Sequence, residues 1–244
     1  MAERDYIMQI CNDYIALSEK ASTHISDLIK KKPDAILCLP TGSTPLLAYQ
    51  LLAKKYQNRE FKSDKLTIVK LDEWCGLTKN HAGSCETYLQ TNVLEPLEIP
   101  RSRYIAFACD PEDPQKEART VEETLAILPP FDLIVLGLGM NGHVGLNEPG
   151  AAFIGKVHVA KLDESSQNHP MLNDTPGVTF GMTIGFDDIL RAKEILMLVS
   201  GENKADQLRR MLQDDISPAF PATNLRMSKN LRIIADRAAA SKLQ

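Results

Sequence analysis

The sequence lacks the features of secreted, membrane-spanning and nucleic-acid-binding proteins. Its five cysteines are odd in number and include no C-x-x-C pair, which is typical of free thiols and not of a disulfide framework. We find no apolar signal region near the N-terminus and no apolar run long enough to cross a bilayer. The formal net charge of -4 argues against nucleic acid as the main partner. We therefore expect a cytoplasmic protein that binds neither membrane nor nucleic acid.

The chain also lacks an internal division. No linker rich in proline, glycine or serine and no block of like charge interrupts the 244 residues. Hydrophobic residues make up 43% of the chain and charged residues 25%, as in ordinary globular proteins. A chain of this length can bury one large core, so we expect residues 1–244 to form a single domain. Cys11 and Cys38 lie in apolar patterns and are expected to be core thiols.

Short apolar runs alternate with helical patterns along the chain. An amphipathic helix is predicted over about 12–31, and Pro33 ends it. The alanine-rich C-terminal segment is expected to fray. Strands are predicted at 35–39, 66–71, 103–107, 133–136, 157–162, 178–184, 195–199 and 231–235. This alternation predicts an α/β fold, with a Rossmann-like, open, mostly parallel sheet and helices on both faces.

The most informative stretch runs from Phe131 to Gly150. A continuous apolar run there breaks into glycines that surround Asn141, His143 and Glu148. Open α/β sheets place their ligand sites on such turns, at the carboxyl ends of buried strands. His143 and Glu148 are close enough in sequence to meet, and a carboxylate can orient a histidine as a general base. The alternatives are a plain polar turn and a histidine that makes only structural hydrogen bonds.

The glycines of this stretch also match the G-x-G-x-x-G pattern of dinucleotide-binding proteins. Asp163 follows Gly142 at the distance of about 20 positions that the pattern requires. The pattern also needs a helix that starts inside it, and the residues after Gly142 do not favour one. We therefore expect no dinucleotide and no other cofactor. No metal is expected either, since His143, His158 and His169 lack the spacing of ligands.

A second candidate site lies at Thr41, Gly42, Ser43 and Thr44. These residues connect a predicted strand to a helix, so free N–H groups and hydroxyls there favour an anion. Lys204, shortly after another strand end, is placed to supply a positive charge to the same anion. The alternatives are an ordinary helix cap and a solvated lysine.

A third candidate site follows the strand predicted at 66–71. Asp72 and Glu73 are adjacent, so on an extended chain their side chains point in opposite directions. One carboxylate can then enter the crevice while the other faces a partner. The alternative is a pair of solvated carboxylates. Further along, residues 150–176 are polar and weakly patterned, and we expect a long loop that acts as a lid.

Four segments together resemble the glucosamine-6-phosphate deaminase family, which is related to 6-phosphogluconolactonases. They are LPTGSTP (39–45), KLDEW (70–74), GLGMNGHVGLNEPG (137–150) and SGENK (200–204). The similarity extends from about Tyr14 to the last predicted strand. Within the family, the sequence looks most like the galactosamine-6-phosphate deaminase/isomerase branch.

The resemblance implies an aldose-to-ketose isomerisation that releases ammonia and needs no cofactor. It assigns to Asp72 the proton transfer between C2 and C1, and to His143, oriented by Glu148, the opening of the sugar ring. Asn141 stands where the glucosamine enzymes have an aspartate, and it can only hydrogen-bond. The implied substrate- and phosphate-binding residues are Thr41, Gly42, Ser43, Thr44, Gly139, Lys204 and His169.

The phosphate site departs from the glucosamine enzymes, because the family's arginine is missing near residues 168–170. Lys204 is therefore expected to matter more, together with His169 if that imidazole is protonated. The predicted reaction converts galactosamine 6-phosphate to tagatose 6-phosphate and ammonia. The alternatives are glucosamine 6-phosphate as substrate, hydrolysis of 6-phosphogluconolactone, and a non-catalytic sugar-phosphate-binding regulator. The sequence does not decide whether the protein forms a homo-oligomer.

Overall fold

A seven-stranded sheet forms the centre of the computed structural model, which describes residues 6–175 and 177–243. Its strand order is β1-β10-β9-β6-β2-β3-β5, and every neighbouring pair is parallel. The strands are β1 (Tyr6–Cys11), β2 (Ile36–Leu39), β3 (Thr67–Lys70), β5 (Tyr104–Ile105), β6 (Leu133–Gly137), β9 (Ile195–Val199) and β10 (Leu231–Asp236). The predicted α/β fold with a mostly parallel sheet is confirmed.

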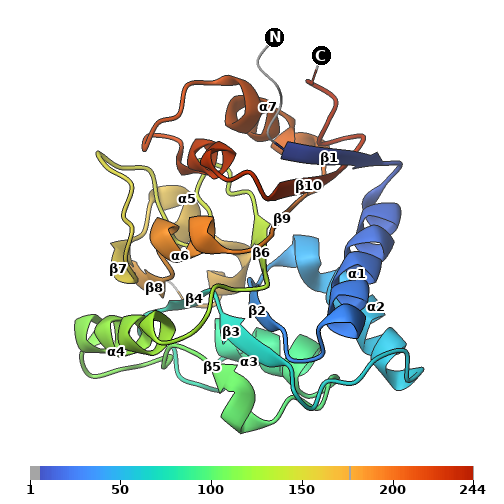
Figure 1. Cartoon of the computed structure of the whole chain (residues 1–244). Coiled ribbons are helices and arrows are strands. Elements are labelled where there is room, and N and C mark those ends of the chain that lie inside the picture. Colours follow the sequence, from blue (N-terminus) through green and yellow to red (C-terminus); the bar gives the residue numbers. More distant parts are fainter. Residues whose placement is uncertain (1–5, 176, 244) are drawn as a thin grey trace.

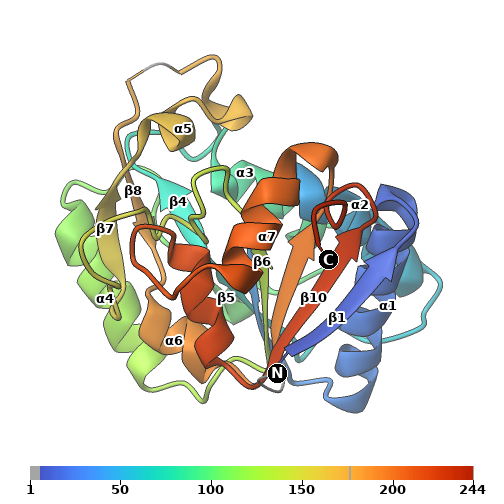
Figure 2. The same cartoon turned by 90° about the horizontal axis from the view of Figure 1, so that it is seen from above.

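Helices cover both faces of this sheet (Figure 1, Figure 2). On one face lie α1 (Tyr14–Lys31) and α2 (Ser43–Gln57); on the other lie α4 (Pro114–Ala126), α6 (Phe186–Arg191) and α7 (Ala205–Gln213). The central strand β6 serves both cores, because Leu133 and Val135 pack in one and Ile134 and Leu136 in the other. This explains why the sequence of β6 shows a continuous apolar run without alternation.

A second sheet was not predicted. It has three antiparallel strands in the order β4-β8-β7: β4 (Asp72–Trp74), β8 (Phe180–Thr183) and β7 (His158–Lys161). The run predicted as one strand at 66–71 therefore ends at Lys70, and the chain re-forms as β4 in the other sheet. Beside β4 lies the short helix α3 (Cys85–Leu89), which continues as a π-helical turn, Gln90–Leu94. Asp72 thus lies at the boundary between the two sheets.

The strand predicted at 157–162 is confirmed as β7, so the further expectation of one long loop over 150–176 is wrong. Strand β7 pairs there with β8, and α5 (Glu164–Gln167) and a 3-10 turn (Pro170–Leu172) follow. Pro176 lies outside the described residues. Figure 2 shows α5 projecting from the body of the molecule beside β8 and β4. The sequence pattern was weak because the elements are short and largely polar.

Both ends of the described chain differ from the predictions. Strand β1 was missed, and it pairs with β10 at the edge of the sheet. Cys11, at the end of β1, is half-buried, whereas Cys38 is fully buried as expected. The alanine-rich segment does not fray: Ala239 is buried and its N–H donates to Asp236 at 2.7 Å.

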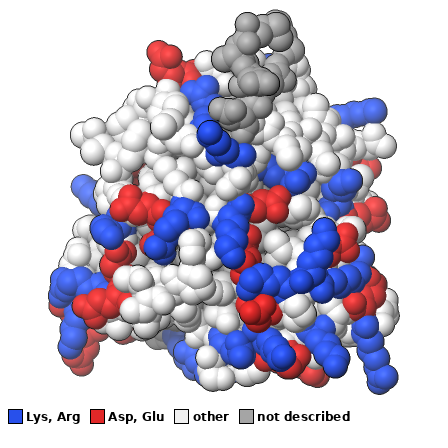
Figure 3. Space-filling model, viewed as in Figure 1, with Lys and Arg blue, Asp and Glu red and all other residues white. Residues whose placement is uncertain are grey.

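Charged side chains of both signs are interspersed over the face of the molecule seen in Figure 3. Many of them form ion pairs, such as Lys32 and Lys193 with Asp132. That pattern is ordinary for a solvated surface and offers no basic stripe for a nucleic acid on this face. Within the described ranges, every helix is too short or too polar to cross a membrane.

Candidate active site

A pocket of about 380 Å³ lies where several strands of the main sheet end. It is lined by residues that follow the carboxyl ends of β2, β3, β6 and β9, which confirms that these strand ends converge. The residues predicted for the site that line the pocket are Thr41, Gly42, Ser43, Thr44, Asp72, Gly139, His143, His169 and Lys204. Asn141 and Glu148 stand behind His143, outside this lining.

One end of the pocket is suited to an anion. Gly42 precedes α2 with φ of 116°, a conformation that favours glycine, and α2 begins at Ser43. No side-chain cap is made at this described helix start, because Gly42 is the capping residue, so the alternative of an ordinary helix cap is not supported. Two tyrosines fix the turn: Tyr88 donates to Gly42 O at 2.6 Å, and Tyr14 donates to Ser43 O at 2.7 Å.

Lys204 lies at the same pocket, at the end of the 3-10 turn Glu202–Lys204. Among the described residues it is the only lysine or arginine in the lining. Burial lowers the pKa of Lys204 from its ordinary value of 10.5. A partly desolvated ammonium group of this kind binds an anion more strongly than a solvated one.

Asp72 faces the pocket from the first position of β4, and Glu73 points to the opposite side, as the spacing predicts. Burial, followed by the negative charge of Glu73, raises the pKa of Asp72 from 3.8 to about 7. The charges of His143 and Lys70 act in the opposite direction but do not cancel this shift. The carboxylate of Asp72 is therefore poised between its two protonation states near neutral pH.

His143 faces Asp72 from the glycine-rich turn after β6. Its Nδ1 lies 3.6 Å from Glu148 Oε2 and 3.1 Å from the hydroxyl of Ser166. The predicted contact between His143 and Glu148 is confirmed, and Ser166 on α5 is an addition that the sequence did not reveal. Gly139 makes room for this ring, because a Cβ at that position would overlap the imidazole. With Nδ1 engaged, Nε2 is the nitrogen that can exchange a proton with a ligand.

Asn141 connects the groups behind His143. Its Nδ2 donates to Glu148 Oε2 at 2.8 Å, and its Oδ1 accepts from the backbone N–H of His143 at 3.0 Å. Burial alone would raise the pKa of Glu148, but hydrogen bonds and charge from His143, together with Ser166 and Asn141, lower it below 4.5. Glu148 is therefore a fixed, ionised carboxylate that orients the imidazole.

His169 lies against Trp74, with 5.7 Å between the ring centroids. Burial and the charges of His143 and Lys204 lower the pKa of His169 to about 4. The imidazole is therefore neutral near pH 7, and the alternative in which its positive charge holds a phosphate is not supported. Because Nδ1 accepts from Met171 N at 3.3 Å, Nε2 carries the proton and remains a neutral donor.

The glycine pattern that resembles a dinucleotide fingerprint has no helix after it. Residues 138–157, all of them described, contain turns and a single bridge between Val144 and Asn147. Asp163 caps α5 by accepting from Ser165 N at 3.0 Å, instead of standing at the end of a second strand. The structural context that a dinucleotide site requires is therefore missing from this part of the chain.

Two site residues beyond Ser166 were also missed. Trp74 lines the pocket two positions after Asp72, and period-two alternation along β4 could have indicated it. Cys85 at the start of α3 places its Sγ 3.9 Å from Asp72 Oδ1 and 3.5 Å from Thr41 Oγ1. No local pattern predicts Cys85, because tertiary packing alone brings α3 to β4.

Comparison with known proteins identifies the class. The family model described as glucosamine-6-phosphate isomerases/6-phosphogluconolactonase matches residues 14–234. The chain therefore belongs to the glucosamine-6-phosphate isomerase/6-phosphogluconolactonase family. Within that family it is an enzyme of the hexosamine-6-phosphate deaminase type, as the following relatives indicate.

The relatives cover nearly the whole chain. "Putative deaminase AgaI" of Escherichia coli (strain K12) is 43% identical over 225 residues, 91% of this chain and 89% of that protein. Glucosamine-6-phosphate deaminase 1 of Bacillus subtilis (strain 168) is 34% identical over 236 residues, 95% of this chain and 97% of that protein. A solved structure of a monomeric glucosamine-6-phosphate deaminase superposes with a TM-score of 0.91 at 34% identity, covering 97% of this chain and 99% of that one.

Proposed function

We propose that this enzyme converts galactosamine 6-phosphate and water to tagatose 6-phosphate and ammonia. The observation that carries the deaminase chemistry is Asp72, a carboxylate with a pKa of about 7 that faces the same pocket as the His143–Glu148 pair. Lys204 and the turn at 41–44 supply donors for a phosphate group at the other side of that pocket. The chosen epimer rests on the sequence resemblance to the galactosamine branch.

The reaction starts with ring opening. His143 Nε2 removes the proton of the anomeric hydroxyl and returns a proton to the ring oxygen, which leaves an aldehyde at C1. Glu148 stabilises the imidazolium that forms in between. Asn141 and Ser166 keep the two side chains in position through the hydrogen bonds described above.

Isomerisation and deamination follow at the other side of the pocket. Asp72 removes the proton from C2, and the electrons of the C–H bond pass to the aldehyde. The C1 oxygen takes a proton from the ammonium group of the substrate, which gives an enolamine. Asp72 then returns its proton to C1 while the nitrogen lone pair forms the C=N bond of an iminium at C2. Water adds to this iminium, and ammonia leaves with formation of the C2 ketone. The aldehyde is thus the electron acceptor of the first step, and the iminium is that of the water addition.

The test is an ammonia-release assay on the purified enzyme with both hexosamine 6-phosphates. A higher kcat/KM for galactosamine 6-phosphate supports the proposal, whereas a preference for the glucosamine epimer contradicts the choice of substrate. Consumption of 6-phosphogluconolactone without ammonia release would identify a lactonase. Tight binding of the sugar phosphates without any turnover would identify a regulator.

A further inference from the structure

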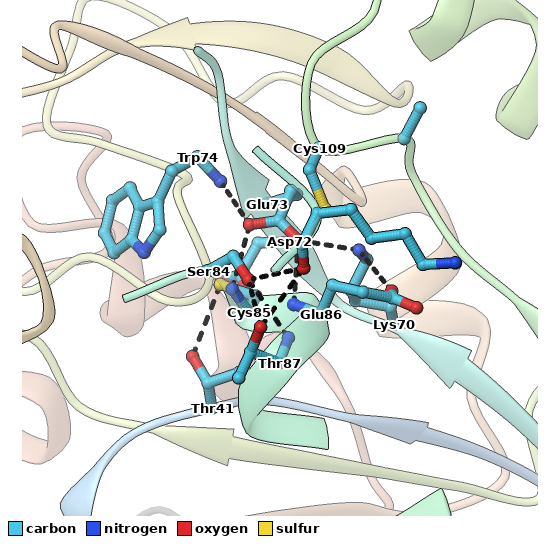
Figure 4. Close-up of polar contacts among 12 residues, drawn as sticks. Thr41, Lys70, Asp72, Glu73, Trp74, Ser84, Cys85, Glu86, Thr87 and Cys109 are labelled. Carbon is cyan, nitrogen blue, oxygen red and sulfur yellow. Dashed lines mark hydrogen bonds and ion pairs between the residues drawn. The ribbon is translucent and has the colours of Figure 1, made fainter. Parts of the chain in front are cut away.

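Glu73 is a buried carboxylate that the proposed reaction does not use. Its exposed fraction is 0%, and both of its oxygens are fully engaged (Figure 4). Oε1 accepts from Trp74 N at 3.0 Å and from Cys85 N at 2.9 Å. Oε2 accepts from Lys70 Nζ at 2.7 Å, from Glu86 N at 2.9 Å and from the thiol of Cys109 at 3.4 Å. Burial of a charged group costs free energy even when the group is paired. A buried Glu73 next to Asp72 is therefore expected to serve a purpose.

Glu73 supports the first turn of α3, which Ser84 caps by accepting from Thr87 N at 3.0 Å. Cys85 and Glu86 are the first two residues of this helix, and their N–H groups have no acceptor within it. Glu73 accepts from both and places a negative charge at the positive end of the helix. Cys85 in turn contacts Asp72 and Thr41, as described above. A continuous set of contacts therefore leads from Glu73, through α3, to two walls of the pocket.

The charges around Glu73 also act on Asp72 directly. Lys70 is buried between Glu73 and Glu86, at 2.7 and 2.9 Å, and Tyr104 donates to Glu86 at 2.9 Å. The group contains one positive and two negative charges. Glu73, Glu86 and Cys109 could in principle ligate a metal ion, but the ammonium group of Lys70 already supplies the positive charge there.

The groups that act on Asp72 come from each neighbouring element. They are Glu73 on β4, Lys70 on β3, His143 on the turn after β6 and Cys85 on α3. Only Glu73 among them makes protonation of Asp72 more favourable. The neighbour on the same strand is thus the one that opposes loss of the Asp72 proton.

We propose that Glu73 is a positioning residue for Asp72, which holds the first turn of α3 against the pocket and provides the negative charge behind the proton-transferring carboxylate. This inference rests on the proposed function only for the role of Asp72 in proton transfer. It is independent of which hexosamine 6-phosphate is the substrate.

The test compares Glu73→Gln with Glu86→Gln. Each variant removes one buried carboxylate and one partner of Lys70, but only Glu73 adjoins Asp72 and holds the N–H groups of α3. Glu73→Gln should move the acidic limb of the kcat/KM–pH profile down by about one pH unit. It should also lower kcat about tenfold with KM nearly unchanged, because a less basic Asp72 is a weaker proton acceptor. Glu86→Gln should leave the position of the limb unchanged.

Glu73→Asp provides the rescue. It restores the negative charge, so the acidic limb should return toward its wild-type position, although the shorter side chain leaves kcat below wild type. A shift caused by general loosening of the site would be the same in Glu73→Asp as in Glu73→Gln. Equal shifts in those two variants, or in Glu73→Gln and Glu86→Gln, would overturn the inference.

A second measurement does not depend on turnover. Carboxyl ¹³C NMR, with the Asp72 signal assigned from Asp72→Asn, should show a lower pKa of Asp72 in Glu73→Gln than in wild type. An unchanged titration would overturn the inference even if the enzyme has another substrate. If Glu73→Gln does not fold, Lys70→Met/Glu73→Gln removes both charges of the pair, which a protein tolerates better than loss of one. Loss of Lys70 offsets part of the effect, because Lys70 lowers the pKa of Asp72 less strongly than Glu73 raises it. The same NMR titration of the double variant should then show a smaller but still measurable lowering.

Discussion

Two buried carboxylates serve the same pocket in opposite electrostatic surroundings. Asp72 has no lysine or arginine partner among the described residues, and burial with the charge of Glu73 raises its pKa to about 7. Glu148 is half-buried with its side chain only 8% exposed, but His143, Ser166 and Asn141 surround it and lower its pKa. Burial raises the pKa of both carboxylates, but the net shifts are opposite. Hydrogen-bond donors surround Glu148, whereas a like charge adjoins Asp72.

This difference suits the two carboxylates to different tasks. A group that takes a proton from one carbon and returns it to the next must exist in both protonation states at working pH, as Asp72 does. A group that only orients and stabilises an imidazolium must stay charged, as Glu148 does. Divergent environments of this kind are a general way to assign acid–base roles within one site. The predictions below alter one carboxylate or its surroundings at a time.

The largest effect is expected for Asp72→Asn, which removes the proton-transferring group while keeping its shape. Ammonia release should fall about 10²–10⁴-fold, the usual range for a lost general base. Binding of the sugar phosphate should persist and can be followed by calorimetry. Ammonia release near the wild-type rate would exclude Asp72 from the mechanism.

The same substitution should stabilise the fold at alkaline pH. The folded chain binds the Asp72 proton with a pKa of about 7, against an ordinary value of 3.8. Between these values the folded state holds more protons than the unfolded state, so the stability of the wild type falls as pH rises. Asp72→Asn removes this penalty, which amounts to up to about 4 kcal/mol above pH 7 at about 1.36 kcal/mol per pKa unit.

Denaturant unfolding of wild type and Asp72→Asn at pH 5 and pH 8 measures this effect. The difference in unfolding free energy should be large at pH 8 and much smaller at pH 5. A difference that does not depend on pH would show that the ionisation of Asp72 is not coupled to folding.

Lys204→Ala tests the anion end of the pocket, away from both carboxylates. A charge-assisted hydrogen bond contributes about 1.5–3 kcal/mol, so KM should rise about 10- to 150-fold. Lys229→Ala, at an exposed lysine, is the matched control and should leave KM unchanged. Because His169 is neutral well above a pKa of about 4, KM should show no dependence on its titration near pH 6.5. An unchanged KM in Lys204→Ala would place the phosphate elsewhere in the pocket.

Asn141→Asp makes the surroundings of Glu148 more like those of Asp72. The substitution replaces the donor 2.8 Å from Glu148 Oε2 with a second negative charge. The pKa of Glu148 should rise by about one unit, which carboxyl ¹³C NMR can follow below the acidic limb that Asp72 sets. Asn141→Ala removes the hydrogen bond without adding charge and should raise the pKa of Glu148 less. Identical titrations of Glu148 in the two variants would contradict the role assigned to charge.

The smallest effect is expected in hydrogen exchange. Ser166 supports His143 from the short helix α5, whereas Asp72 lies within a sheet. Short helices open more readily than paired strands, so a bound sugar phosphate should slow exchange in residues 163–175 more than in β4. Equal protection in both regions, with and without ligand, would make α5 a fixed wall of the pocket.

The sequence was sufficient for six of the seven strands of the main sheet and for most of the pocket. Continuous apolar runs such as β6 and β9 indicated strands buried on both faces, and the glycine- and hydroxyl-rich residues after them indicated the crevice. The opposite directions of Asp72 and Glu73 followed from the geometry of a strand. Such features are local, so a single sequence can carry them.

The parts that were missed depend on contacts between distant segments. Strand β4 has only three residues, whose alternation indicates the side that each side chain faces but not the partner strand. Its place in a second sheet with β8 could therefore not be predicted. Strand β1 exposes Ile7 and Ile10 at a sheet edge, and no strand was predicted there. Ser166 and Cys85 reach the site only through the packing of α5 and α3. The low pKa of His169 likewise depends on burial that only the folded chain provides.

The pairing of β1 with β10 joins the two ends of the described chain into one ladder, from Tyr6 beside Leu231 to Cys11 beside Asp236. During synthesis β1 emerges before the other described strands, whereas β10, its neighbour in the sheet, emerges after all of them. Until then β1 is an unpaired strand with apolar side chains, which is prone to associate with other chains. Closure of the sheet at this edge therefore requires all the described elements between β1 and β10, and this contact, with its high contact order, slows the completion of folding.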